Sequence, residues 1–308
     1  MTPIRIAIVG LGKIARDQHV PALRASDDFE LVATVSPDGA GIDDLPHFAS
    51  LDALLEGGPA IDAVAICTPP QVRRELASLA LARGLHVLIE KPPAASLSEV
   101  AALEQQAAAS GVTLFAAWHS RFAAGVAGAR AWLAEREITS VTITWREDVR
   151  VWHPGQEWIW QPGGFGVFDP GINALSIATG ILPRPIFLAE AELEFPANRD
   201  APIAARLELA DTRGTPIAAD FDFRQTGPQT WDIAIETDVG QLLLSHGGAT
   251  LTLPEGTQRG EDREYAGLYA RFAELIDEGR SEADTAPLRL VADAFMRGRI
   301  LRTDPFED

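Results

Sequence analysis

The chain has 308 residues, enough for two domains of ordinary size, and its 46 % of hydrophobic residues is typical of a globular protein. The net charge of -18 argues against nucleic acid or an anionic membrane as a partner, because both are polyanions. The single cysteine, Cys67, excludes a disulfide framework and suits a reducing cytoplasm. The sequence lacks an apolar run long enough for a membrane span, and Arg5 interrupts the N-terminal segment, so we expect neither a span nor a signal peptide.

A glycine-rich motif follows the first predicted strand, Ile4 to Val9. It has the form G-x-G-x-x-A, in which the first glycine permits a tight turn, the second lets a pyrophosphate approach the backbone, and a small third residue lets the helix pack closely. Such turns are common, but this one follows a strand and opens a helical stretch, which favours a nucleotide site. The predicted contacts here are Gly10, Gly12, Lys13 and Ile14.

The second predicted strand, Phe29 to Val35, ends where a dinucleotide domain reads the adenosine ribose. An acidic residue there selects NAD and an arginine suits the 2′-phosphate of NADP. The segment Ser36-Pro37-Asp38 matches neither pattern, since Ser36 could serve either coenzyme and Asp38 lies late for the role. A simple turn explains it equally well. We therefore expect NAD or NADP as the cofactor, with both accepted.

Strands and helices alternate through the rest of the N-terminal half. Helices are predicted at Leu51 to Glu56, Arg73 to Arg83 and Ser98 to Ser110, and strands at Ala63 to Cys67, His86 to Ile89 and Thr113 to Ala116. This alternation predicts a Rossmann domain over residues 1–121, with a doubly wound parallel sheet. The Thr68-Pro69-Pro70 turn and the Glu90-Lys91-Pro92 turn fall at strand carboxyl ends, so both should border the cofactor.

Lys91 follows its strand directly and precedes two prolines, which cannot continue a sheet. A capping box, Ser96 to Glu99, then opens the next helix, so the lysine is held between two rigid elements. A surface lysine after a strand is the alternative reading. The rest of the chain favours a catalytic lysine.

The C-terminal half, residues 122–308, shows a different pattern. Strand-like segments at Val141 to Trp145, Leu188 to Phe195, Ala218 to Phe223, Trp231 to Glu236 and Gln241 to Ser245 follow one another without helices between them. They predict a substrate-binding α+β domain on a largely antiparallel sheet with one open face, through which a homo-oligomer could form. Two amphipathic helices, Tyr265 to Asp277 and Pro287 to Leu301, are predicted at the end.

Aromatic and polar residues gather in this half. Three of the seven tryptophans lie within Trp152 to Trp160, and aromatic faces suit the C–H face of a sugar ring. Packing of a loop onto the sheet is the alternative for each tryptophan. Asp169 and Asn173 are four residues apart, so a helix starting near Asp169 would place both on one face. The candidates for a small polar ligand are His119, Glu147, Trp152, Asp169, Asn173 and Trp231.

Together the glycine motif, Gln18 to Ala22, Cys67 to Pro70 and Glu90-Lys91-Pro92 resemble the glucose–fructose oxidoreductase/inositol dehydrogenase family. The resemblance implies a nicotinamide dehydrogenase with Lys91 beside the nicotinamide and the reacting hydroxyl. In that family an aspartate precedes, by four residues, a histidine credited as the acid/base. Asp169 matches the aspartate, but Asn173 replaces the histidine and cannot take a proton near neutral pH. Lys91 or Asp169 must then accept the proton, and we favour Lys91 as relay with Asp169 as its partner.

Lys91 with Asp169 to Asn173, together with Trp118 to Arg121 and Trp152 to Trp160, most resembles the L-arabinose and D-galactose 1-dehydrogenases of this family, and the resemblance favours L-arabinose. This resemblance implies NAD(P)-dependent oxidation of an aldopyranose at C1 to an aldonolactone, in sugar catabolism, with Lys91 and Asp169 as catalytic residues. The sugar would lie among His119, Glu147, Trp152, Asn173 and Trp231. A regulator of the same fold that binds a dinucleotide without turnover is the alternative, although it has no reason to keep Lys91 and Asp169 together. We predict no metal site.

Overall fold

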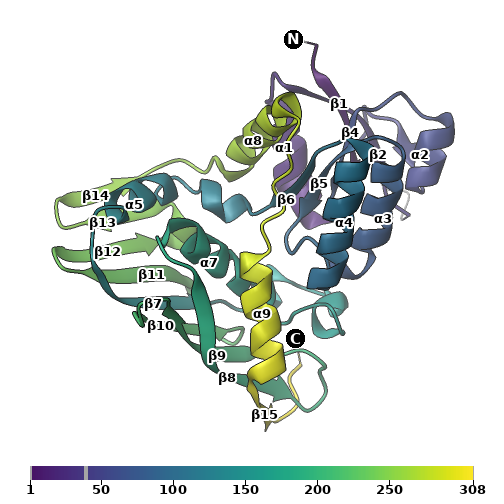
Figure 1. Ribbon diagram of the computed structural model, residues 1–308. Helices are drawn as coiled ribbons and strands as arrows, with labels where there is room; N and C mark the ends of the chain where they lie inside the picture. The colour runs from purple at the N-terminus through teal and green to yellow at the C-terminus, as the bar shows by residue number, and fades with distance from the viewer. Residues whose placement is uncertain (1, 38–40, 308) are drawn as a thin grey trace. The chain divides into compact units, whose positions relative to one another are not determined.

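The computed structural model describes residues 2–37 and 41–307, and the chain divides into two compact units (Figure 1). Unit 1 comprises Met1–His119 and Tyr265–Asp284, and unit 2 comprises Ser120–Glu264 and Thr285–Asp308. A single division after residue 121 was expected from the sequence. The chain instead returns to unit 1 late, with a helix from its C-terminal part.

Unit 1 is built on a six-stranded sheet in the order β3-β2-β1-β4-β5-β6, and all its strand pairs are parallel. Its strands are β1 (Ile4–Val9), β2 (Phe29–Val35), β3 (His47–Phe48), β4 (Ala63–Ile66), β5 (His86–Glu90) and β6 (Leu114–Ala117). The central strands β1, β4 and β5 are buried because helices cover both faces of the sheet. The predicted doubly wound Rossmann sheet is confirmed.

Helices on each face of this sheet come from different parts of the chain. They are η1 (Ala15–His19), α1 (Val20–Arg24), α2 (Leu51–Gly57), α3 (Pro70–Ala82), α4 (Leu97–Ser110) and α8 (Glu264–Glu278). The predicted capping box is present, since Ser96 accepts from the Glu99 amide and Glu99 accepts from the Ser96 amide. The segment after the glycine motif differs from an ordinary helix, because η1 is a π-helical turn.

Helix α8 belongs to unit 1 because its apolar face is buried against the parallel sheet. Phe272 stacks on Phe29 of β2 and on Phe115 of β6. Tyr265 and Tyr269 of the same face are also buried. The amphipathic pattern predicted the helix, and only the fold decides which sheet it covers.

Unit 2 is built on a nine-stranded sheet in the order β14-β13-β12-β11-β7-β10-β9-β8-β15. Its strands are β7 (Ile138–Arg146), β8 (Ile186–Pro196), β9 (Ala204–Asp211), β10 (Pro216–Asp222), β11 (Thr230–Thr237), β12 (Gly240–Ser245), β13 (Thr250–Leu253), β14 (Gly256–Arg259) and β15 (Arg299–Thr303). The β10–β7 and β15–β8 pairs are parallel and the other pairs are antiparallel. The predicted, largely antiparallel sheet is confirmed.

The longest helices of unit 2, α5 (Val126–Leu133), α7 (Phe168–Ile181) and α9 (Ala286–Arg297), pack against this sheet, as does the short η4 (His246–Gly248). The other short helical segments are η2 (His119–Phe122), which joins the units in sequence, α6 (Val149–Trp152) and η3 (Glu157–Trp160). The helix predicted from Pro287 to Leu301 was too long. Gly298 is extended and ends α9, and the following residues pair with β8 as an edge strand.

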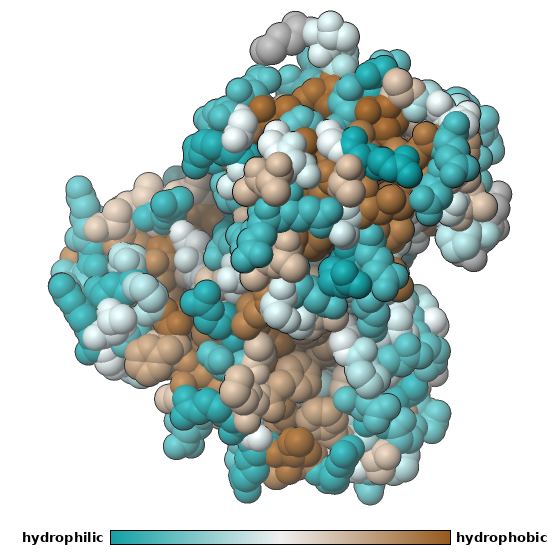
Figure 2. Space-filling model, turned by 45° about the vertical axis from the view of Figure 1, so that its right-hand side comes forward, coloured by the Kyte–Doolittle hydropathy of each residue, from teal (hydrophilic) through white to brown (hydrophobic). Residues whose placement is uncertain are grey.

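None of the helices in the described residues is long and apolar enough to cross a membrane, and these residues contain no cluster of side chains suited to a metal ion. Hydrophilic residues cover much of the face shown in Figure 2, with apolar residues among them. The cytoplasmic location stays a prediction.

Candidate active site

The carboxyl ends of β1, β2 and β4 meet at one edge of the unit 1 sheet. Gly10 follows β1, and its amide donates to the Val35 carbonyl at 2.8 Å, while the Cys67 amide donates to the Val9 carbonyl at 2.8 Å. Gly10 has φ 95°, a conformation that a side chain would strain. The glycine motif and the Thr68 turn are therefore brought together at this edge, as predicted.

The backbone at this edge fits a dinucleotide. A Cβ added to Gly10 would lie 2.8 Å from Thr68 Cγ2, so the turn closes only with glycine there, whereas a Cβ on Gly12 would meet open space. The Thr68 hydroxyl is buried and has no hydrogen-bonding partner among the described residues. Open space above Gly12 beside an unsatisfied buried hydroxyl suits a ligand that approaches the backbone closely and carries polar atoms.

The other predicted cofactor residues line the same edge. Lys13 is exposed and forms an ion pair with Asp17, and Ile14 is also exposed. Ser36 is buried, and its amide donates to the Phe48 carbonyl at 3.0 Å. Pro69 precedes α3. Asp38 lies outside the described residues, so the role considered for it stays a prediction.

Lys91 follows β5 in a turn that is fixed by a buried arginine. Arg73 of α3 is 5 % exposed and donates to the Thr68 carbonyl at 2.7 Å and to the Glu90 carbonyl at 2.8 Å. It also donates to the Pro92 carbonyl. The Lys91 amide donates to the Glu90 carboxylate at 2.8 Å, and its side chain is partly buried. The turn that carries Lys91 is thus tied to the Thr68 turn by one guanidinium group.

Beneath this turn, Glu90 belongs to a buried ionic cluster. Its carboxylate accepts from His19 Nε2 at 3.0 Å and from the Tyr265 hydroxyl at 2.7 Å, while His19 Nδ1 contacts the Tyr269 hydroxyl at 2.7 Å. Burial alone would raise the pKa of Glu90, but His19, His119 and Arg73 hold it well below its usual range. Burial alone would lower the pKa of His19, but Cys67 and Glu90 raise it to about 9. His19 and Glu90 therefore form a buried ion pair at neutral pH.

His119 ends the first segment of unit 1 and stacks on the Tyr265 ring, with 5.1 Å between ring centroids and 19° between planes. It is the one predicted sugar residue that belongs to unit 1. The others lie in unit 2.

Unit 2 brings most of the predicted polar residues together around His153, which no sequence pattern singles out. Glu147 is 2 % exposed and accepts from Trp231 Nε1 at 2.9 Å and from His153 Nε2 at 3.1 Å. His153 Nδ1 lies 4.0 Å from a carboxylate oxygen of Asp169. The Trp152 and Trp231 rings lie 4.9 Å apart, beside this row of side chains. Carboxylates, an imidazole and indole faces thus meet in one place.

Asp169 and Asn173 lie on α7, which follows a tight loop. A Cβ on Gly164 would lie 2.0 Å from the Trp158 carbonyl, so this loop packs closely on the tryptophan segment. Helix α7 then starts at Phe168, which places Asp169 in the first turn and Asn173 one turn later. The helical spacing predicted for the two residues is confirmed. Asp169 is 5 % exposed, and the free amides of a helix start favour its negative charge.

Several residues of these clusters were missed from the sequence, although weak signals existed. His153 adjoins Trp152 in the tryptophan-rich segment, and the strand period places Trp145 and Glu147 on one side of the chain. Trp145 indeed stacks on Trp231, with 5.9 Å between centroids. Tyr265 and Tyr269 are the only two tyrosines of the chain and are one helical turn apart. No local signal connects them with Glu90, which lies far away in the sequence.

Comparison with known proteins gives consistent matches over the full chain. Residues 4–118 match a family model described as an oxidoreductase family with an NAD-binding Rossmann fold. The whole chain is 48 % identical to galactose 1-dehydrogenase of Pseudomonas fluorescens, over 100 % of both proteins. The solved structure of a D-galactose-1-dehydrogenase protein from Rhizobium etli is 54 % identical, with a TM-score of 0.95 over 100 % of this chain and 99 % of that one.

A more distant match supports the fold alone. A 3-ketoreductase from Actinomadura kijaniata, solved with NADP and TDP-benzene, superposes with a TM-score of 0.84 at 21 % identity, over 98 % of this chain and 99 % of that one. Three observations indicate an oxidoreductase with a dinucleotide-binding domain. They are the sheet edge of unit 1 that suits a dinucleotide, the family model and the full-length relatives. The chain is therefore a member of the glucose–fructose oxidoreductase/inositol dehydrogenase family, a family of oxidoreductases whose cofactor is NAD or NADP.

Proposed function

We propose that the protein is an NAD(P)-dependent aldose 1-dehydrogenase that oxidises the C1 hydroxyl of D-galactose and of L-arabinose to the aldonolactone. The main support is the unit 2 cluster of Asp169, His153, Glu147 and Trp231, whose polar atoms and indole face suit a pyranose ring. Full-length relatives named galactose 1-dehydrogenase favour D-galactose. L-Arabinose stays a prediction that rests on the motifs.

The reaction removes a hydride from C1 and a proton from the anomeric hydroxyl. The residues that would hold the dinucleotide are Gly10, Gly12, Lys13, Ile14, Ser36, Thr68 and Pro69, and a dinucleotide bound there would accept the hydride. In our proposal Lys91 polarises the anomeric hydroxyl and relays its proton, and Asp169 is the second catalytic residue. The C1–O bond then becomes the carbonyl of the lactone.

His153 adds a second route for the proton within unit 2. Asp169 lies beside its Nδ1, and Glu147 accepts from its Nε2, so this ring can take a proton while Glu147 stabilises the charge. The family pattern expects its histidine at the position of Asn173. A nearby imidazole from another segment compensates for that departure.

Two substitutions separate these roles. Asp169→Asn should lower kcat by roughly 10²-fold if the carboxylate accepts the proton, because an amide cannot. His153→Gln should lower kcat and change the KM for the sugar little if the imidazole carries the proton onward. A variant Asp169→Asn that only raised KM would instead identify Asp169 as a binding residue.

The enzyme should discriminate between sugars by the configuration of their ring hydroxyl groups. Glu147, Asp169 and Asn173 can each bond a sugar hydroxyl, and an epimer would leave a desolvated group unpaired, at about 1–3 kcal/mol or roughly ten- to hundredfold. D-Galactose and L-arabinose share their ring hydroxyl arrangement and differ in the C5 substituent. D-Glucose, the C4 epimer of D-galactose, should be at least about tenfold poorer in kcat/KM.

The test is a panel of D-galactose, L-arabinose and D-glucose with NAD⁺ and with NADP⁺, followed by the absorbance of the reduced nicotinamide and by identification of the first product. Both coenzymes should work, because Ser36 carries no charge to repel a 2′-phosphate. Equal rates with D-glucose and D-galactose would contradict the hydroxyl-reading argument. Binding of coenzyme without turnover of any sugar would favour a regulator.

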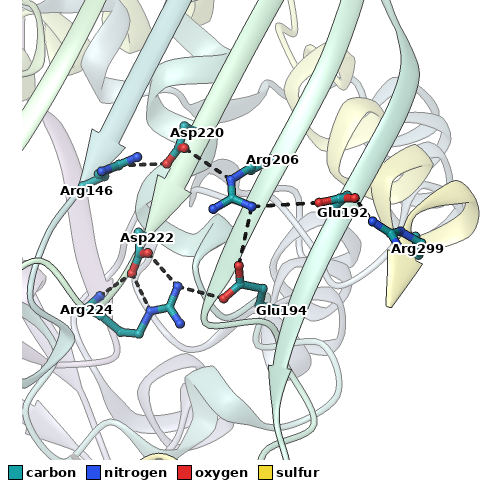
Figure 3. Close-up of polar contacts among 8 residues, drawn as sticks. All are labelled: Arg146, Glu192, Glu194, Arg206, Asp220, Asp222, Arg224 and Arg299. Carbon is teal, nitrogen blue, oxygen red and sulfur yellow. Dashed lines mark hydrogen bonds and ion pairs between the residues drawn. The ribbon is translucent and has the colours of Figure 1, made fainter. Parts of the chain in front are cut away.

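We also propose that two copies associate through the open face of the unit 2 sheet. One ion-pair network lies there and joins four arginines with four carboxylates (Figure 3). Its members come from β7, β8, β9, β10 and β15, except Arg224, which follows β10. Its formal charges cancel, whereas the whole chain carries -18. A neutral, half-exposed sheet face avoids the repulsion that other surfaces of two copies would meet.

A further inference from the structure

Helix α8 supplies a hydroxyl to the carboxylate that holds Lys91. Tyr265 and Tyr269 are buried on one face of α8, and these are the only tyrosines of the chain. Tyr265 donates to Glu90 Oε1 at 2.7 Å, and Glu90 Oε2 accepts from the Lys91 amide at 2.8 Å. One carboxylate thus connects α8 with the backbone of the proposed catalytic lysine.

The Glu90 carboxylate contacts both the Tyr265 hydroxyl and the Lys91 amide, so it can couple the position of one to that of the other. It is 2 % exposed, and His19 Nε2 donates to the same oxygen as Tyr265, at 3.0 Å. Two donors on Oε1 therefore fix the carboxylate plane, and the remaining oxygen fixes the start of the Lys91 turn. Glu90 is a predicted cofactor contact, but its buried carboxylate binds residues of its own unit.

We propose that Tyr265 is a positioning residue for Lys91, acting through the Glu90 carboxylate to fix the place of the lysine ammonium during turnover. This inference rests on the proposed role of Lys91 in sugar oxidation. A misplaced catalytic group loses rate rather than binding, because the correct geometry is needed only in the transition state. Tyr265 would then set kcat without contacting substrate.

A purely structural role is the competing explanation, since Tyr265 also helps to attach α8 to the sheet. Thr113 provides a matched control. It is 1 % exposed, and its hydroxyl donates to the Leu275 carbonyl of α8 at 3.5 Å. Thr113→Val weakens the attachment of α8 without touching Glu90, whereas Tyr265→Phe removes only the hydroxyl and keeps the ring that stacks on His119.

The chain contains only two lysines, Lys13 and Lys91, which makes a direct measurement simple. Labelling with ¹⁵N-lysine gives two backbone amide resonances, and Lys13→Arg assigns them. In Tyr265→Phe the Lys91 resonance should shift or broaden while the Lys13 resonance stays in place. In Thr113→Val neither should move.

Kinetics supply the second measurement. In Tyr265→Phe, kcat should fall about tenfold with the KM values for sugar and coenzyme within about twofold. The deuterium isotope effect on kcat with C1-deuterated sugar should rise, because hydride transfer becomes slower relative to product release. A smaller folded fraction would lower kcat and leave the isotope effect unchanged.

The proposal is overturned if the Lys91 resonance and kcat do not change together in Tyr265→Phe, or if Thr113→Val reproduces both changes. If Tyr265→Phe does not fold, Glu90→Gln applies the same criteria, because the amide keeps the volume and loses the charge. A wild-type protein that oxidises no sugar would refute the proposed function. The lysine resonances would still decide whether Tyr265 holds Lys91.

Discussion

Lys91 is the residue on which the proposed chemistry depends most directly. Lys91→Met removes the ammonium group and keeps the apolar stem, so kcat should fall by roughly 10²-fold or more, since the charge acts mainly in the transition state. The dissociation constant of the coenzyme, measured by fluorescence titration, should change little. Lys13→Met is the control, because it removes the other lysine of the same unit and should change coenzyme affinity more than kcat. Near-normal turnover of Lys91→Met would refute the assignment.

The buried side chain of His19 makes the stability of the folded protein depend on pH. Its folded pKa of about 9 lies above the ordinary value of 6.5, so the folded state favours the proton. The groups that face it are Glu90 of β5, Tyr265 and Tyr269 of α8, and Cys67. This stabilisation is fully present below about pH 6.5 and is lost as the pH rises through about 9, with a size on the order of 1–3 kcal/mol.

Thermal unfolding at several pH values tests this linkage. Between pH 7 and about pH 9.5 the Tm of the wild type should fall more than that of His19→Gln, which lacks the titrating group. His86→Gln serves as the control. Burial lowers the pKa of His86, so its contribution is lost toward acid pH and not in this range. Parallel Tm curves for the wild type and His19→Gln would show that the ion pair is not formed.

At the scale of elements, Arg73 connects α3 with the ends of β4 and β5. Arg73→Lys should lower the free energy of unfolding by about 2–4 kcal/mol, because an ammonium cannot reach the three carbonyls that the guanidinium fork satisfies. Coenzyme affinity should fall as well, since both turns border the proposed site. Urea unfolding and coenzyme titration measure the two effects.

The neighbouring Arg74→Lys is the matched control. Arg74 is 44 % exposed and pairs with Glu75 and Glu99 at 3.6 Å and 3.9 Å, contacts that are worth well under about 1 kcal/mol. Equal destabilisation by the two substitutions would mean that the carbonyl contacts of Arg73 do not hold the turns.

The helices and strands differ in how closely the sequence predicts their type and bounds. Helix α4 was predicted almost to its ends because a capping box and a C-terminal glycine are local signals. The sequence predicts the residues of edge strand β15 as the end of a helix, because the pairing of β15 with β8 is a long-range contact. The π-helical turn η1 was also missed. It ends at His19, whose contacts with Glu90 and Tyr269 come from elements distant in the sequence.

At the scale of the whole molecule, the proposed association through the open sheet can be tested by reversing one charge. Arg206 lies within 4.0 Å of Glu192, Glu194 and Asp220, at 3.9 Å, 3.9 Å and 3.7 Å. Arg206→Glu would place four carboxylates together and should shift the protein from dimer to monomer in light scattering after size exclusion. Arg280→Glu, on the surface of unit 1, should leave the mass unchanged. A monomeric wild type would refute the association.

The sequence by itself determined the parallel Rossmann sheet, the dinucleotide turn and the position of Lys91 after β5. These features depend on local signals: hydrophobic period, glycine and proline chemistry, and helix caps act between residues a few positions apart. Only the tertiary structure decided that α8 covers the first sheet, that Tyr265 and His19 hold Glu90, and that His153 lies between Glu147 and Asp169. Contacts of that kind join residues far apart in the chain, so no local pattern encodes which buried polar group meets which partner.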